Sequence, residues 1–119
     1  LLGAVSETEA ASLVAAFDIA TLTTRRDKLP PFLIEAMAHA IPVISTASGD
    51  MTPLVTATGT VVPHQRPERL SAAWGEYYHM SQSARRACGL RARQQVLERY
   101  NLQHIVDSYQ ALFARLGAG

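Results

Sequence analysis

The apolar residues of the chain fall into short continuous runs separated by stretches with helical spacing. Residues 17–23 and 42–46 form two such runs, whose length and apolar character are typical of buried strands. Residues 32–39 lie between them with apolar side chains at helical spacing, and residues 60–62 form a third, short edge strand. Strand, helix and strand in this order make a βαβ unit. We therefore predict an α/β fold with three short parallel strands covered by helices.

Capping residues mark the starts of the other helices. Ser6 and Glu9 form a capping box that opens a helix ending near Ala16. Pro67 opens another helix, Ser81 or Ser83 caps the next, and Asn101 caps the last. The helix from Pro67 carries the stripe Leu70, Ala73, Trp74 and Tyr77, where packing is a far more common role for Trp74 than stacking on a ligand. The last helix carries a long apolar stripe formed by Leu102, Ile105, Val106, Tyr109, Leu112, Phe113 and Leu116.

The helix over residues 32–39 should end before Pro42, which cannot continue it. Its stripe of Ile34, Met37, Ala38 and Ile41 is expected to face the sheet. Ala40 stands where a glycine would take a left-handed cap, and alanine there costs on the order of 1 kcal/mol. We expect this turn to close differently.

Two carboxylates, Asp27 and Glu35, flank the loop between the first strand and this helix. In a βαβ unit, functional groups collect at the carboxyl end of the strand and at the N-terminus of the helix, which attracts anions. On spacing alone the commoner interpretation is structural: Asp27 as a solvated loop or capping residue, and Glu35 as a first-turn carboxylate favoured by the helix dipole. The residues around Asp27 and Glu35 favour a functional interpretation.

Several short motifs occur together around these acids. They are Asp27 and Glu35 with seven residues between them, Glu35-Ala36-Met37-Ala38, Pro42-Val43-Ile44, Gly49, and residues 59–63. Together they resemble the carboxyl-terminal domain of GT-B glycosyltransferases, and within these the retaining family four of the glycogen-synthase and sucrose-synthase type. The resemblance covers nearly the whole chain, since residues 2–6 resemble that family's opening segment and residues 99–102 introduce its closing helix.

The resemblance implies a Rossmann-like parallel sheet, part of a GT-B carboxyl-terminal domain, and an enzyme that transfers a sugar from a nucleotide-sugar donor with retention. It implies that Glu35 holds the ribose hydroxyls and that Asp27 lies near the donor sugar. The loop residues Lys28, Leu29 and Pro30 would contact the substrate, and Ala4 and Val5 would offer main-chain contacts to the base. No metal or other cofactor is expected.

The chain departs from that family at the centre of the motif. Asp27 is one methylene shorter than the family's glutamate, and residues 28–31 replace its Gly-aromatic-Gly-Leu with two prolines that cannot donate a main-chain hydrogen bond. Lys28 could compensate with a cation near the diphosphate. Asp50 and Pro53 replace a further glycine and a glutamate. Two hypotheses follow: an active glycosyltransferase domain, or a degenerate, non-catalytic nucleotide-sugar-binding or interaction module.

Composition narrows the class of protein. The 119 residues are 48% hydrophobic and 18% charged, which suits one soluble globular unit. A formal net charge of +1 gives no sign of nucleic-acid binding, and no apolar run approaches the ~20 residues of a membrane span. Cys88 is the single cysteine, which excludes an intramolecular disulfide and suits a reducing cytoplasm. The four histidines lie too far apart in sequence for a metal site and are interpreted as structural or solvent-facing.

We interpret residues 1–119 as a single partial nucleotide-sugar-binding domain, a fragment of a larger two-domain enzyme. The resemblance implies that an amino-terminal acceptor domain is missing, so the isolated fragment should be inactive and its last helix partly exposed. Arginines between residues 85 and 99 are interpreted as a solvated face, with peripheral contact to an anionic membrane surface as the alternative. The expected location is the cytoplasm, or the cytoplasmic face of the membrane in the second case.

Overall fold

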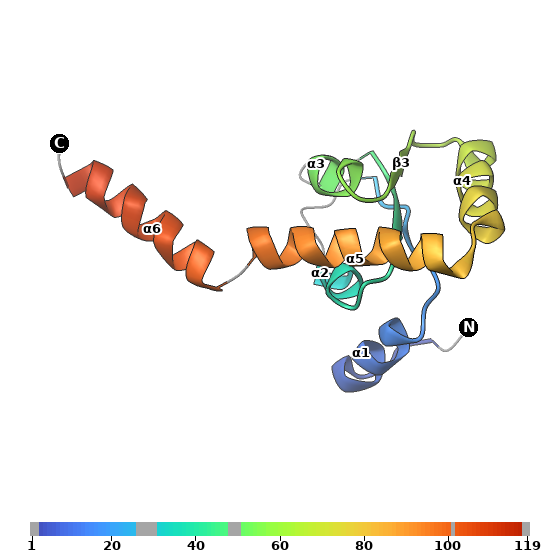
Figure 1. Cartoon of the computed structure of the whole chain (residues 1–119), viewed down its shortest axis with the longest axis horizontal. Helices are drawn as coiled ribbons and strands as arrows, with labels where there is room; N and C mark the ends of the chain where they lie inside the picture. The colour runs from blue at the N-terminus through green and yellow to red at the C-terminus, as the bar shows by residue number, and fades with distance from the viewer. Residues whose placement is uncertain (1–2, 26–30, 48–50, 101, 118–119) are drawn as a thin grey trace.

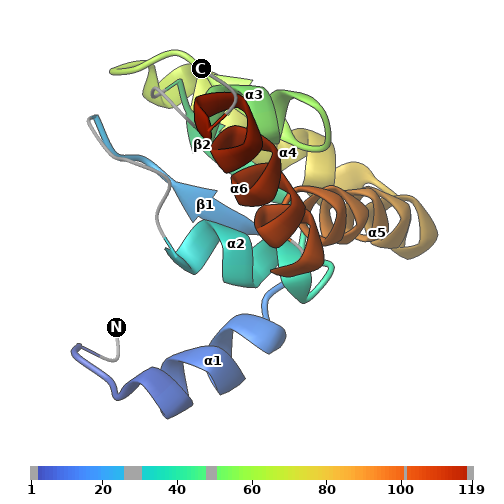
Figure 2. The same ribbon diagram turned by 90° about the vertical axis from the view of Figure 1, so that its left-hand side faces the viewer.

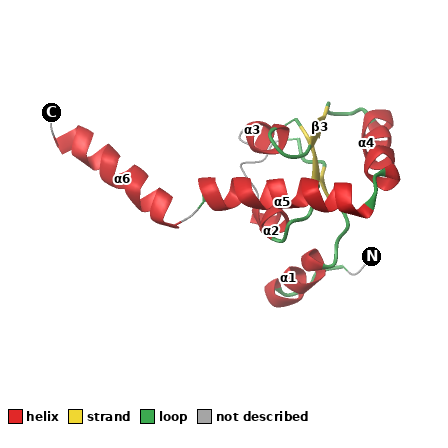
Figure 3. Cartoon of the chain, viewed as in Figure 1, coloured by secondary structure: helices red, strands yellow, loops and turns green. Residues whose placement is uncertain are grey.

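The computed structural model describes residues 3–25, 31–47, 51–100 and 102–117. Six helices and three strands are assigned in this part of the chain, and their order is shown in Figures 1 and 3. They are α1 (Glu7–Ala15), β1 (Ala20–Leu22), α2 (Pro31–Ala38), β2 (Val43–Thr46), α3 (Met51–Thr56), β3 (Thr60–Val62), α4 (Pro67–His79), α5 (Gln82–Arg99) and α6 (Leu102–Gly117).

The sheet has the order β1-β2-β3, and both neighbouring pairs are parallel. Ala20 pairs with Val43, and Ile44 pairs with Thr60, so the three strands run side by side with their carboxyl ends at one edge. The predicted α/β class, with three parallel strands, is confirmed. As predicted, β3 is an edge strand.

Helices cover both faces of this sheet. On one face, residues of α2, α3 and α5 pack with Ala20 and Val43 into the larger hydrophobic core, which includes Leu33, Met37, Leu54, Val55, Ala92 and Val96. On the other face, Ala73 and Tyr77 of α4 pack against Ile44 and Val62 in a smaller core. Because successive side chains of a strand point to opposite faces, Val43 of β2 joins the larger core and Ile44 joins the smaller one.

The first strand is shorter than predicted. Residues 17–19 are not part of β1, because the chain is still completing the end of α1 there. The Ala16 amide donates to the Leu13 carbonyl and the Phe17 amide to the Val14 carbonyl, both at 3.0 Å. Phe17 remains 40% exposed, with its ring edge against Phe32, so an apolar residue at a helix end was mistaken for the start of a strand.

The stripe of α2 also differs from the prediction. Its buried residues are Leu33, Ala36 and Met37, whereas Ile34 is half-buried and Ala38 is exposed. Ile41 is buried, but it lies beyond the last helical residue. The helix therefore presents a face rotated from the predicted one.

Ala40 adopts the left-handed conformation, with φ of 60°, so the expectation of a different turn was wrong. The Ile41 amide donates to Ala36 and the Ala40 amide to Met37, both at 3.0 Å, which is the Schellman pattern of helix ends. The two hydrogen bonds, together with burial of Ile41, offset the cost of placing alanine there.

The predicted helix starts are largely confirmed. The Glu9 amide donates to Ser6 Oγ and the Ser6 amide to Glu9 Oε2, each at 3.2 Å, which is the predicted capping box. The Ser81 hydroxyl accepts from the Ala84 amide, so Ser81 rather than Ser83 caps α5. Asn101 lies outside the described residues. The helix α3 was not predicted, because six residues with Pro53 in the first turn show no helical period.

The last helix, α6, projects away from the sheet in Figure 1 and points toward the viewer in Figure 2. The molecule measures 54 × 31 × 30 Å with a radius of gyration of 16.3 Å, above the ~13.5 Å typical of a compact domain of this length. Val106, Tyr109, Leu112, Phe113 and Leu116 are exposed along α6. The predicted exposure of part of its apolar stripe is confirmed.

Trp74 and Tyr77 of α4 differ in burial. Trp74 is 47% exposed and its indole nitrogen donates to Thr21 Oγ1 of β1 at 2.9 Å, so it lies along the sheet rather than inside the core. Tyr77 is 3% exposed and its hydroxyl lies 3.2 Å from that of Thr60. Burial raises the pKa of the Tyr77 phenol above its ordinary value of about 10, and the hydrogen bond with Thr60 opposes part of this rise.

This raised pKa predicts a loss of stability at alkaline pH. Above pH ~10 the unfolded Tyr77 ionises while the folded one keeps its proton, so the stabilising contribution is complete below pH ~10 and is lost as pH rises through the folded pKa. Tyr77→Phe should flatten the stability profile above pH ~10 and cost about 1 kcal/mol at pH 8 through the lost Thr60 hydrogen bond. Urea unfolding of wild type and variant at pH 8 and above pH ~10 measures these changes in the free energy of unfolding. An equally steep alkaline loss in wild type and variant would contradict it.

Candidate functional site

The carboxyl ends of the three strands meet at one edge of the sheet, where ligands of open parallel sheets bind. Two hydrogen bonds hold the strand ends together. Thr46 Oγ1, at the end of β2, donates to the Thr24 carbonyl at 2.6 Å. The Ala47 amide donates to the Val62 carbonyl, at the end of β3, at 2.9 Å. The segments after β1 and β3 are thereby fixed on either side of β2.

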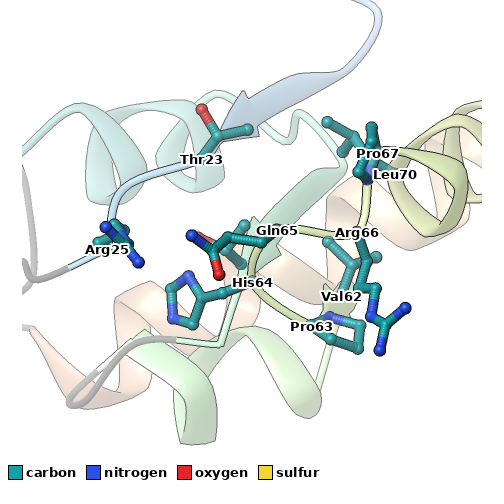
Figure 4. A pocket seen from close by; sticks show the side chains of 10 residues that line it. Thr23, Arg25, Val62, Pro63, His64, Gln65, Arg66, Pro67 and Leu70 are labelled. Carbon is teal, nitrogen blue, oxygen red and sulfur yellow. The ribbon is translucent and has the colours of Figure 1, made fainter.

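A cavity of about 330 Å³ lies at this edge, on the side of the sheet covered by α4. We call it the carboxyl-edge cavity, and Figure 4 shows its lining side chains. The segment after β1 contributes Thr23 and Arg25, and β2 contributes Thr46. The rest of the lining comes from the end of β3, the following loop and the start of α4: Val62, Pro63, His64, Gln65, Arg66, Pro67 and Leu70.

The described lining of the cavity carries cationic and amide groups and no carboxylate. Arg25 is exposed and makes no ion pair with any described residue. Arg66 is paired instead with Glu68 in the first turn of α4, with 3.7 Å between Nη1 and Oε1. His64 is half-buried in the loop after β3. Val62, Pro63 and Leu70 supply an apolar wall.

The loop after β3 turns tightly into α4. Gln65 has a φ of 55°, in the left-handed region that few residues other than glycine adopt. Arg66 is the N-cap of α4 and makes no side-chain capping hydrogen bond, and Pro67 occupies the first turn. The N-terminus of a 13-residue helix, with its positive dipole end, therefore begins at the cavity.

Of the residues predicted to contact the donor sugar, the diphosphate or the ribose, only Glu35 lies in the described part of the chain. Asp27, Lys28, Leu29 and Pro30 lie outside it, as do Gly49 and Asp50. Glu35 is half-buried and is the fifth residue of α2, beyond the first turn, so the structural interpretation that placed it in the first turn was wrong. The helix dipole acts only weakly on a carboxylate placed there. Glu35 does not line the carboxyl-edge cavity, which is on the α4 side of the sheet, whereas α2 covers the other.

The segment predicted to contact the base lies near α1. Ala4 and Val5 line a shallow depression of about 560 Å³ with residues of the first two turns of that helix. Both residues are exposed, so their main-chain groups are accessible, and the predicted contact stays a prediction.

Sequence reasoning did not identify Arg25, His64 and Gln65 as site residues. Arg25 has no motif of its own, and His64 was assigned to a structural or solvent-facing role. The available signal was their position: each lies within three residues of the end of a predicted strand, and the carboxyl ends of parallel strands share one edge. The register that brings the two segments to the same cavity comes from the structure.

Across residues 3–25, 31–47, 51–100 and 102–117, no helix is long and apolar enough to cross a membrane. In the same ranges, no group of three or more histidine, cysteine, aspartate or glutamate side chains could hold a metal ion.

Known proteins resemble this chain in sequence and in fold. The putative colanic acid biosynthesis glycosyltransferase WcaL of Salmonella typhimurium is 34% identical over 79 residues, which are 65% of this chain and 20% of that protein. The solved structure of sucrose-phosphate synthase from Thermosynechococcus elongatus superimposes with a TM-score of 0.82 at 25% identity, over 98% of this chain and 30% of that one. The chain thus spans less than a third of either relative, and its parallel sheet is part of a GT-B carboxyl-terminal domain.

The family described as Glycosyl transferases group 1 matches residues 1–79, which is more than half of the chain. The matched segment contains the three described strands and every described residue that lines the carboxyl-edge cavity. This chain belongs to the group 1 family of glycosyl transferases.

Proposed function

We propose that the protein transfers a sugar from a nucleotide-sugar donor to an acceptor with retention of the anomeric configuration, and that this chain supplies part of the donor site. The family match over residues 1–79 carries the proposal. The cationic cavity at the carboxyl edge supports it, because a nucleotide sugar presents a diphosphate to the protein.

The reaction breaks the bond between the anomeric carbon and the diphosphate oxygen. Positive charge develops on the sugar ring, and negative charge develops on the departing diphosphate. In the proposal Asp27 lies near the donor sugar, while Lys28 and main-chain groups of Leu29 and Pro30 lie along the substrate. Cationic side chains and amides offset the diphosphate charge, so we expect no metal cofactor.

We propose two partners for this chain, the nucleotide-sugar donor and an acceptor-binding domain. An acceptor-binding domain outside these 119 residues would complete the cleft, because sugar transfer needs donor, acceptor and charged groups in one desolvated space. We propose a cytoplasmic location, with contact to the membrane surface only if the arginines of α5 bind anionic lipid.

Glu35→Gln is the direct test of the donor site. We expect the 119-residue chain to bind nucleoside diphosphates in the millimolar range, because one wall of the cleft leaves the ligand largely in water. A carboxylate that accepts hydrogen bonds from two ribose hydroxyls should account for most of this affinity, so Glu35→Gln should weaken binding about tenfold or more. Titration of the ¹⁵N-labelled chain with uridine, adenosine and guanosine diphosphates, followed by amide chemical shifts, measures the dissociation constants.

Glu76→Gln is the matched control, since Glu76 is exposed on α4 and does not line the carboxyl-edge cavity. It should leave nucleotide binding unchanged. Equal affinity in wild type and Glu35→Gln would refute the ribose assignment. Complete absence of nucleotide binding, even with the acceptor domain present, would favour the non-catalytic interaction module.

A further inference from the structure

The carboxyl-edge cavity brings basic groups from two separate segments together on the α4 side of the sheet. We propose that it is an oxyanion subsite, in which Arg25 and His64 bind a phosphate or carboxylate group of a sugar substrate. That the ligand is a sugar substrate rests on the proposed function. The binding of an oxyanion rests on the cavity alone.

The charge balance of the cavity favours an anion. Arg25 lies on the side of the cavity formed by the segment after β1, and its guanidinium pairs with no described carboxylate. No described residue that lines the cavity is an aspartate or glutamate. Arg66 also lines the cavity, but it is paired with Glu68, and Figure 4 shows its side chain extending away from Arg25. Arg25 is therefore the cation available to a ligand among the described lining residues.

Hydrogen-bond donors converge on the same space. Figure 4 shows the side chains of His64 and Gln65 extending toward the side on which Arg25 lies. An imidazole and an amide can each donate to an oxyanion, and a guanidinium can donate two parallel hydrogen bonds to a carboxylate or phosphate. The N-terminus of α4, without a side-chain cap from Arg66, adds its positive dipole end at the adjoining wall.

The volume and the apolar wall of the cavity limit the size and the kind of molecule that carries the oxyanion. At about 330 Å³ it is near the lower end of the ~300–1,000 Å³ typical of small-molecule pockets. It can hold an oxyanion with the sugar ring attached to it, but not a whole nucleotide sugar. Val62, Pro63 and Leu70 form the apolar wall against which the C–H face of such a ring would pack.

Two substrates could supply this chemistry: the diphosphate of the donor, or a carboxylate on a sugar. Pyrophosphate and glucuronate represent them, and glucose is the neutral comparison. Titration of the ¹⁵N-labelled chain should give saturable amide shifts at Arg25, His64 and Gln65 with at least one anion and none with glucose. Arg25→Gln should weaken this binding at least about tenfold, and His64→Asn should weaken it less.

Arg69→Gln is the control, because Arg69 is an exposed arginine of α4 that does not line the cavity. It should not change the affinity. Binding of pyrophosphate alone assigns the subsite to the donor diphosphate, and binding of glucuronate assigns it to a sugar carboxylate. The proposal is overturned if neither anion gives saturable shifts, or if wild type and Arg25→Gln bind with equal affinity. The nucleotide test at Glu35 uses another residue and another probe, so either inference can fail while the other stands.

Discussion

Gly89→Ala is expected to destabilise the protein by about 3 kcal/mol or more, although alanine is the better helix former. Gly89 is buried in α5, where this helix crosses the end of α2. A Cβ at this position would lie 2.6 Å from the Ala40 carbonyl carbon and closer still to its oxygen. Both are backbone atoms of the left-handed turn that ends α2, so no side chain can rotate away.

The helices would have to separate, and the contacts of Ala92 and Val96 with the larger core would loosen with them. Overpacking of a core costs about 1–3 kcal/mol, and a clash with backbone lies at or above the upper end of that range. Such a loss is a large part of the ~5–15 kcal/mol by which small domains are stable. Urea unfolding followed by circular dichroism would measure it.

Gly75→Ala is the matched control. Gly75 lies in the interior of α4, and a Cβ there would meet no atom within 4 Å. The same substitution should therefore stabilise the protein by about 0.5–1 kcal/mol, through helix propensity alone. If both variants shift the unfolding midpoint in the same direction, the close approach of α5 to Ala40 does not have the energetic role assigned to it.

The local signals in the sequence predicted most of the fold. The capping box at Ser6 and the cap at Ser81 depend on residues three apart, and the structure has both. The three parallel strands follow from apolar runs whose burial any packed sheet requires. The error at residues 17–19 is also local, because an apolar stretch interrupted only by Asp18 continues from the end of α1 into β1.

Features that depend on distant contacts were not predictable in this way. The cost of a left-handed Ala40 argued against that conformation, yet the structure adopts it, with two backbone hydrogen bonds and the Gly89 contact from a helix some fifty residues away. Neither the apolar period nor the helix propensity of residues 31–41 predicts these contacts. The same holds for the face of α2, whose rotation is set by the helices packed against it.

The candidate site likewise combines a residue that a local motif identified with residues that only the folded structure brings together. Glu35 was found through its motif, which is continuous in sequence, and its placement on α2 agrees with the predicted helix. Arg25 and His64 belong to segments about forty residues apart, and they line one cavity because β1 and β3 flank β2 in parallel register. Their positions after two predicted strands are the one sequence signal that connects them, and those positions do not give the register that brings both to one cavity.

The exposed stripe of α6 leads to the last prediction, that the 119-residue chain associates with itself. Phe113 is 66% exposed and Leu116 is 68% exposed, and Tyr109 stacks on Phe113 with 6.3 Å between ring centroids. An apolar stripe of this length on a projecting helix is larger than the isolated apolar residues that monomers commonly expose. Pairing of two α6 helices would bury both stripes in a symmetric contact.

Removing the apolar groups at the centre of that contact should abolish association. In a symmetric pair, Phe113→Glu with Leu116→Glu deletes four apolar side chains and places like charges opposite each other, so the dissociation constant should rise by a factor on the order of 100 or more. Sedimentation equilibrium over a range of concentrations measures it.

Leu90→Glu with Leu97→Glu is the control, because these leucines are 50% and 52% exposed on α5, away from the stripe. A wild-type chain that stays monomeric at high micromolar concentration, or a control that dissociates as readily as the α6 variant, would show that the stripe does not drive association. The α6 variant should keep the wild-type stability, since the mutated side chains lie outside both hydrophobic cores.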